Sequence, residues 1–335
     1  KRSEQLCLES AIKYFIIGAL ASGLLLFGFS FLFGVTGSLS YSSIAHFFLV
    51  HPVSGNGIAS FALILIISAL LFKLGLVPFH SWVADVYDGA PNGVTLFISG
   101  APKVAVMVVL IRLLISPLHA FSYQWRPVLE FAAVASIALG NLVAIAQTNI
   151  KRMLAYSSIS HMGYALLGLC AASVGVAHSY SAVFLYIICY AFMSVGAFGF
   201  ITMMSRFGVE LREIKDLSGL SNSQPWLAFM FLLIMFSIAG IPPLVGFMAK
   251  ITILERLIQA HLVWLAVFAI VFSIIVAFYY IRIIKVMYFE QLKECDQRVV
   301  YSASESFFTI TIVSGAILLV GILPGALISF CRFIF

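Results

Sequence analysis

Long uninterrupted apolar runs recur along this chain, and they constrain its fold more than any other feature. Examples are Phe61–Leu71, Leu227–Ala239 and Trp264–Ala277. A helix needs roughly 20 mostly apolar residues to cross a bilayer, whereas a transmembrane barrel strand needs roughly 10 residues of alternating polarity. Because these runs are long and do not alternate, they predict membrane-spanning helices.

The composition points to the same solvent. Hydrophobic residues make up 62% of the chain and charged residues only 10%, against about 25% charged residues in soluble domains. The chain therefore faces lipid over most of its surface. A net charge of +6 could indicate nucleic-acid binding, but the basic residues form no single patch and are better explained as topology signals. We expect a lipid bilayer as a partner and no nucleic acid.

We predict one all-α polytopic membrane domain over residues 1–335, with about nine helices by the 20-residue criterion. The predicted spans lie near 10–33, 57–78, 92–116, 127–147, 153–174, 180–205, 226–258, 262–288 and 306–330. Lys151, Arg152 and Lys285 then lie on one side with most other basic residues, and that side is predicted to face the cytoplasm or an equivalent compartment. Since the chain opens with Lys-Arg-Ser-Glu and no Met, we expect it to be truncated at its N-terminus.

Two of the predicted spans are interrupted by glycine and proline. The first reads Lys73-Leu-Gly-Leu-Val-Pro78, and the second reads Gly240-Ile-Pro-Pro243 and continues to Lys250. Proline removes a backbone donor and clashes with the preceding turn, so each helix must kink or unwind there. Broken helices in two corresponding halves indicate a transporter built from inverted repeats, with its site near mid-membrane. The alternative is that these residues only permit close helix packing.

Four side chains are candidates for proton transfer: Lys73, Lys103, His161 and Lys250. A charge inside a membrane costs a few kcal/mol or more, so such groups generally face a bundle interior or a wet cavity. Lysines in such places are able to bind and release protons, and histidine titrates near neutrality. The alternatives are that Lys250 extends its charge to the membrane surface, and that His161 only bonds a neighbouring helix.

A polar segment follows the first break and carries His80, Asp85 and Asp88. Asp85 and Asp88 could be taken for a pair of metal ligands together with His80, but no further ligand is spaced to complete a metal site. We therefore predict no metal, and a short interfacial segment that leads into the next helix.

Three stretches together resemble the signature of the antiporter-like membrane subunits of complex I, the proton-pumping NADH:quinone oxidoreductase. They are Lys73–Pro91, Asn149–Tyr164 and Gly240–Lys250. The likeness covers the whole chain. Asp-Val-Tyr-Asp-Gly-Ala-Pro91, Ala-Pro-Lys103 and the lysine at 250 favour the branch called subunit N (chain 2 in organelles) over subunits M and L and the multi-subunit cation antiporters.

The resemblance implies a role for each candidate residue. Lys73 would be the central proton-carrying lysine, Lys103 the bridging lysine, His161 the link between two half-channels, and Lys250 the exit-side lysine. In the family, the lysine of the first broken helix pairs with a glutamate on a preceding helix. Glu9 matches a different family position and is not assigned as that partner.

The resemblance also implies partners. The chain would be a non-redox, proton-translocating subunit among the other membrane-arm subunits. NADH, FMN, iron–sulfur clusters and quinone would be bound by partner subunits, with no cofactor bound by this chain. The membrane would be a bacterial inner membrane or an organellar one. The alternatives are a subunit of a multi-subunit Na⁺/H⁺ antiporter and a structural subunit whose lysines form static pairs.

Overall fold

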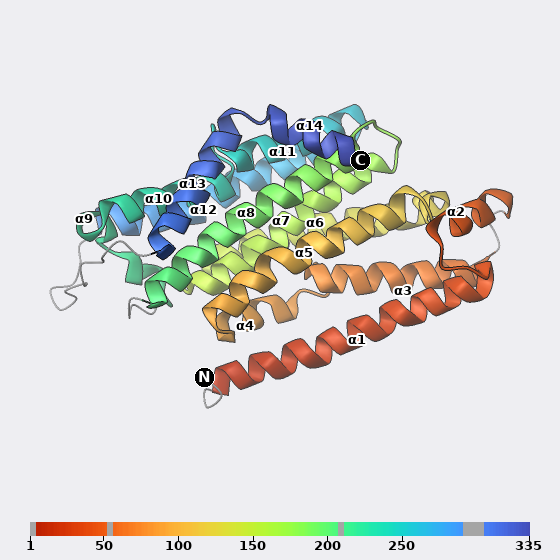
Figure 1. Cartoon of the computed structure of the whole chain (residues 1–335), viewed down its shortest axis with the longest axis horizontal. Helices are drawn as coiled ribbons and strands as arrows, with labels where there is room; N and C mark the ends of the chain where they lie inside the picture. Colours follow the sequence, from red (N-terminus) through yellow and green to blue (C-terminus); the bar gives the residue numbers. More distant parts are fainter. Residues whose placement is uncertain (1–4, 52–55, 207–210, 291–304) are drawn as a thin grey trace.

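The computed structural model describes residues 5–51, 56–206, 211–290 and 305–335, and helices account for all regular elements in these ranges. The long helices run side by side along the longest axis of the molecule (Figure 1). In chain order the elements are α1 Gln5–Thr36, α2 Tyr41–Val50, α3 Gly57–Leu74, α4 Ser81–Gly89, α5 Asn92–Ile115, η1 His119–Phe121, α6 Ser122–Ala146, α7 Ile150–Ala172, α8 Ser179–Arg206, η2 Ile214–Leu217, α9 Leu220–Ser223, α10 Pro225–Ala239, α11 Val245–Gln259, α12 Val263–Phe289, α13 Glu305–Ile322 and α14 Gly325–Ile334.

The all-α prediction is confirmed, whereas the number of spans stays a prediction. By length and composition, 6 helices of the described part are able to cross a membrane, or up to 7 if one bent pair is a single span. Helix α7 is not among them, because Lys151, Arg152 and several hydroxyl groups lower its hydropathy. It is nevertheless the most buried helix of the bundle, and it contacts α4, α6, α8, α11 and α12.

Three of the predicted spans are interrupted. Two breaks lie where the sequence predicts them: α3 ends at Leu74, and the span 226–258 is divided into α10 and α11. The third was not predicted: the span 306–330 is divided into α13 and α14 with a bend of 84°. In each case a proline follows the end of the first helix or begins the next turn, and it cannot donate the backbone bond that would continue the helix. The amphipathic segment after the first break is the short helix α4, with most of its apolar residues buried.

The two breaks have the same backbone geometry. Gly75 (φ 74°) ends α3 and Gly240 (φ 86°) ends α10, both in the left-handed region that suits glycine. The amide of Gly75 donates to the carbonyls of Leu71 and Phe72, and the next amide also donates to Leu71. The amide of Gly240 donates in the same way, one turn back. Each break is thus a glycine C-cap that terminates the helix with its last carbonyls facing the bundle.

One end of the bundle is rich in basic residues, and we call it the basic end. There α6 ends and α7 begins, with Lys151 and Arg152 in the first turn of α7. On α12, Arg282 donates from its two terminal nitrogens to the carbonyls of Ile145 (2.9 Å) and Gln147 (2.6 Å), at the end of α6. The same end holds α4 and the start of α1, on the left in Figure 1. The orientation of this end toward the cytoplasm or an equivalent compartment stays a prediction.

Candidate functional site

Lys103 lies at the centre of the bundle, on α5. Its side chain is 1% exposed, and its Nζ donates to the Ser158 hydroxyl on α7 at 2.7 Å. The ammonium also lies 5.5 Å from the ring centroids of Tyr87 and Tyr190. A cation is stabilised over aromatic faces when it is desolvated. Among the described residues, no carboxylate forms an ion pair with this lysine. Its charge is therefore held by neutral groups.

His161 is on the buried face of α7, one turn beyond Ser157. It is 3% exposed, and its Nδ1 shares a hydrogen bond of 2.8 Å with the Tyr186 hydroxyl on α8. Its ring also lies 5.4 Å from that of Tyr190 and 6.4 Å from that of Tyr164. Both nitrogens of an imidazole take part in proton exchange, so a histidine set among hydroxyl groups is suited to pass a proton on.

Lys250 is on α11, beyond the second break, and its charge turns inward. The side chain is 5% exposed, so the alternative that it reaches the membrane surface is wrong. Its Nζ donates to the Ala239 carbonyl at 2.8 Å and to the Ser273 hydroxyl at 3.2 Å. The Ala239 carbonyl belongs to the last turn of α10, which is the negative end of that helix and favours a cation. The ammonium also lies 5.3 Å from the Tyr164 ring.

Lys73 is on the last turn of α3, and its environment is different. Its Nζ donates to the Ser22 hydroxyl on α1 at 3.0 Å. It also lines a pocket with about 490 Å³ of empty space, bounded by α1, α3, α4 and α5. Pro102, which precedes Lys103 directly, is part of the same lining. Lys73 is thus the least enclosed of the four candidates.

The structure brings three of the four predicted site residues into one continuous polar group. Tyr190 contacts both Lys103 and His161, and Tyr164 contacts both His161 and Lys250. We call this group the central path. Beyond Lys250 lies a second pocket of about 840 Å³, also lined by Ser273 and by the residues of the second break. The central path thus reaches the second pocket at Lys250, and at its other end Lys103 follows Pro102, which lines the first pocket.

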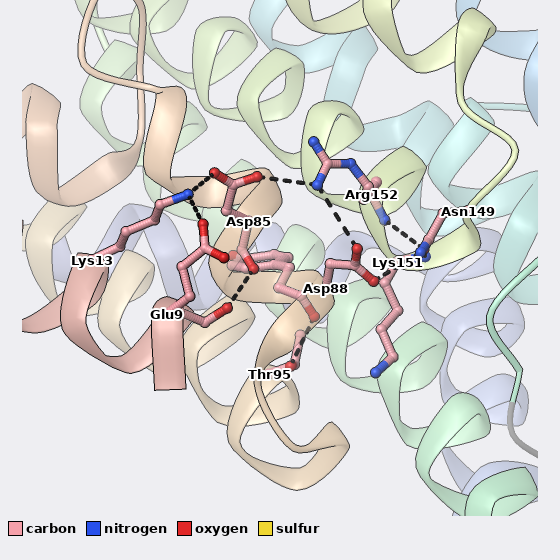
Figure 2. A network of polar contacts seen from close by, with 10 residues as sticks. Glu9, Lys13, Asp85, Asp88, Thr95, Asn149, Lys151 and Arg152 are labelled. Carbon is pink, nitrogen blue, oxygen red and sulfur yellow. Dashed lines mark hydrogen bonds and ion pairs between the residues drawn. The ribbon is translucent and has the colours of Figure 1, made fainter. Parts of the chain in front are cut away.

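A separate polar network ties three helices together at the basic end (Figure 2). Asp85 on α4 accepts from Lys13 of α1 (2.8 Å) and from Arg152 of α7 (3.1 Å). Lys13 also pairs with Glu9 at 2.6 Å, and Asn149 donates to Asp88 at 2.8 Å. Both aspartates weighed as metal ligands are thus engaged in ion pairs or hydrogen bonds.

These contacts shift the protonation of Asp85. Partial burial raises the pKa of its carboxyl, but the hydrogen bonds from Lys13 and Arg152 outweigh burial and lower the net pKa below its usual value of 3.8. Asp85 is therefore ionised at neutral pH. Glu9 is engaged with Lys13, and Lys73 with Ser22, so the structure agrees with leaving Glu9 unassigned as the partner of Lys73.

Sequence reasoning did not identify the hydroxyl groups that serve the lysines and the histidine. Tyr186 and Tyr190 lie one turn apart on α8, within a long apolar run. Tyrosines with helical spacing inside a membrane helix were the available signal, because their hydroxyl groups need partners there. Ser22, Ser158 and Ser273 carried no such signal, since single serines are common where membrane helices pack closely.

Known proteins match the whole chain. Residues 1–276 match the family model described as the transmembrane region of NADH:quinone oxidoreductase and Mrp antiporters. The NADH-quinone oxidoreductase subunit N of Coxiella burnetii is 49% identical over 100% of this chain and 68% of its own length. A chain of respiratory complex I from Thermus thermophilus has a TM-score of 0.79 and 30% identity, over 96% of this chain and 68% of that one.

A chain of the Mrp complex from Dietzia has a TM-score of 0.87 at 21% identity, over 98% of this chain and 67% of that one, and this likeness shows the fold alone. The chain belongs to the NADH:quinone oxidoreductase/Mrp antiporter family of integral, multi-pass membrane proteins. Within that family its relatives are subunits N of NADH-quinone oxidoreductase. It spans roughly two thirds of the length of those relatives.

Proposed function

We propose that this chain is a proton-translocating membrane subunit of NADH:quinone oxidoreductase in a bacterial inner membrane. The observation that carries the proposal is the central path, in which Lys103, His161 and Lys250 are joined through Tyr190 and Tyr164. No carboxylate among the described residues forms an ion pair with any of these three groups. Its support also includes the relatives called subunit N and the complex I chain of similar fold.

The chemistry follows from the surroundings of each group. Within the described part of the chain, the ammonium of Lys103 is held by Ser158 and two rings and forms no ion pair, so it can lose its proton without breaking one. His161 accepts on one nitrogen and donates from the other, so it can connect the two lysines. Lys250 faces the pocket of the second break, through which we propose that the proton leaves. Lys73, beside the first pocket, is proposed to supply Lys103.

Electron transfer is proposed to occur elsewhere in the assembly. NADH, FMN, iron–sulfur clusters and quinone would be bound by partner subunits, and this chain would be a non-redox component. The redox reaction would act on this chain by changing which groups around its lysines are charged, because a nearby positive charge favours deprotonation of a lysine. The other membrane-arm subunits are the partners through which such a change would arrive.

The test is Lys103→Ala in the whole complex, in inverted membrane vesicles oxidising NADH. We expect quinone-linked proton pumping to fall about tenfold or more, as for the loss of a group that transfers a proton. The matched control is Lys215→Ala, which removes an exposed lysine from η2. Normal pumping in Lys103→Ala would contradict the assigned path. Cation-dependent transport without NADH-linked activity would instead support the Na⁺/H⁺ antiporter.

A further inference from the structure

A second buried polar group lies between α6, α7 and α12, on the side of His161 that faces the basic end. Ser157 and Tyr280 share a hydrogen bond of 2.6 Å, and the Tyr279 hydroxyl donates to the Asn141 side-chain oxygen at 3.2 Å. All four side chains are buried. The rings of Tyr279 and Tyr280 lie 4.7 Å apart, so the two hydrogen bonds belong to one cluster. The central path as described above does not use any of them.

Two buried polar atoms beside this cluster have no partner among the described residues. They are the Asn141 side-chain nitrogen and the Ser160 hydroxyl. Buried polar atoms without a protein partner generally bind water, because an unsatisfied donor is costly. Ser160 directly precedes His161 along the chain. The residues that carry these atoms adjoin both groups: Asn141 accepts from Tyr279, and Ser160 is next to His161 in the sequence of α7.

The helix packing brings these atoms together. A Cβ on Gly140 would lie 2.8 Å from the Tyr156 carbonyl oxygen and 2.9 Å from the Ser160 nitrogen. Helices α6 and α7 therefore approach as closely as only glycine allows, at the residue before Asn141. Close contacts of this kind place side-chain polar groups of two membrane helices within bonding reach.

The cluster extends toward the basic end. Ser157 lies about 10 Å along α7 from Ile150, and His161 about 16 Å, at a rise of 1.5 Å per residue. Arg282 follows Tyr280 by two residues on α12 and binds the carbonyls at the end of α6. The polar groups thus occupy the depth between the basic end and His161, where a closed apolar core would otherwise stop a proton.

We propose that Ser157, Tyr280, Tyr279, Asn141 and Ser160 form a proton branch, with bound water, between the basic end and His161. Each hydroxyl or water accepts a proton on a lone pair and releases its own to the next oxygen, so no group gains or loses charge overall. The Asn141 nitrogen and the Ser160 hydroxyl hold the water that completes the branch. The proposal rests on the proposed function and adds a second connection to one surface.

The experiment uses Tyr280→Phe in the whole complex, because this change keeps the ring and removes only the hydroxyl. The matched control is Tyr288→Phe, eight residues further along α12. In inverted vesicles, we expect Tyr280→Phe to slow NADH-driven proton pumping at least threefold, and to raise the ratio of the rates in H₂O and D₂O above that of the wild type. Tyr288→Phe should change neither quantity. NADH oxidation by an artificial acceptor that bypasses the membrane part measures assembly.

The outcomes separate the branch from the path. Normal pumping in Tyr280→Phe with blocked pumping in Lys103→Ala overturns the branch and leaves the proposed function standing. Normal pumping in both variants overturns both. A slower rate with an unchanged isotope ratio shows a structural role for Tyr280 and also overturns the branch. Where Tyr280→Phe fails to assemble, Ser157→Ala removes the partner hydroxyl from α7 and is judged by the same two measurements.

Discussion

A single methyl group added at Gly240 should disturb the second break through the side chain of Lys250. The residue has φ 86°, and a Cβ there would lie 2.9 Å from both Cδ and Nζ of Lys250. Alanine in the left-handed region costs roughly 1–2 kcal/mol. Displacing the ammonium from the Ala239 carbonyl loses a charged hydrogen bond, about 1.5–3 kcal/mol. We expect Gly240→Ala to destabilise the chain by roughly 2.5–5 kcal/mol in total.

Gly175→Ala is the matched control for this change. Gly175 has φ 82°, and no atom lies within 4 Å of its Cβ position. It should therefore lose only the backbone contribution, about 1–2 kcal/mol. The difference between the two variants, roughly 1.5–3 kcal/mol, measures the displacement of Lys250.

Unfolding free energies come from denaturant titration in detergent, followed by tryptophan fluorescence. Proton pumping is measured on the assembled complex, where Gly240→Ala should slow it and Gly175→Ala should leave it unchanged. Equal destabilisation by the two substitutions, together with equal pumping, would refute the reasoning. It would mean that the Lys250 side chain moves away from the added methyl group without loss.

Three further predictions concern other parts of the chain. The pKa of Asp85 in the folded state is below 3.8, so its carboxylate stabilises the fold fully above pH 3.8 and less as the pH falls through the folded-state pKa. The melting temperature of Asp85→Asn should therefore depend less on pH between 5 and 3 than that of the wild type. Gly89→Ala should loosen α1 from α4, since its Cβ would lie 2.6 Å from the Leu6 carbonyl oxygen. Gly93→Ala, with no atom within 4 Å of its Cβ position, is the control. Protease cleavage of α1 should be faster in Gly89→Ala and unchanged in Gly93→Ala. Tyr186→Phe removes the hydrogen bond to His161 Nδ1 and should slow pumping about fivefold, for a loss of roughly 1 kcal/mol. An unchanged rate would show that this hydrogen bond does not contribute to proton transfer through His161.

The broken helices and the buried lysines could be predicted from the sequence because both rest on strong local chemistry. At 75 and 78, and again at 240 and 242, a glycine is followed within three residues by a proline, and this combination favours the end of a helix. A lysine among apolar neighbours in a membrane helix generally faces the bundle interior or a wet cavity, and Lys103 and Lys250 are indeed buried. The membrane class followed from run length and low charge alone.

The remaining features depend on tertiary contacts that no local pattern contains. Helix α7 is polar along much of its length, yet it is the buried centre of the bundle, because its hydroxyl groups are bonded to neighbouring helices. The bend between α13 and α14 lies at Pro324, inside a stretch that run length alone predicts to be one span. The pairing of Lys103 with Ser158 joins residues 55 positions apart on α5 and α7, and only the assembled bundle reveals it.

The two breaks differ in what holds their free carbonyl ends. At the first, the Trp82 indole nitrogen donates to the Phe72 carbonyl at 3.2 Å. An indole does not titrate, so this hydrogen bond does not change when protons are transferred. At the second, the donor is Lys250, and a hydrogen bond from an ammonium is roughly twice as strong as one from a neutral amine. With Lys250 as a proton carrier, each departing proton also weakens the joint between α10 and α11. The proton on Lys250 would then also stabilise the contact between α10 and α11. Loss of that proton would weaken the hydrogen bond to the Ala239 carbonyl and loosen α11 from the end of α10.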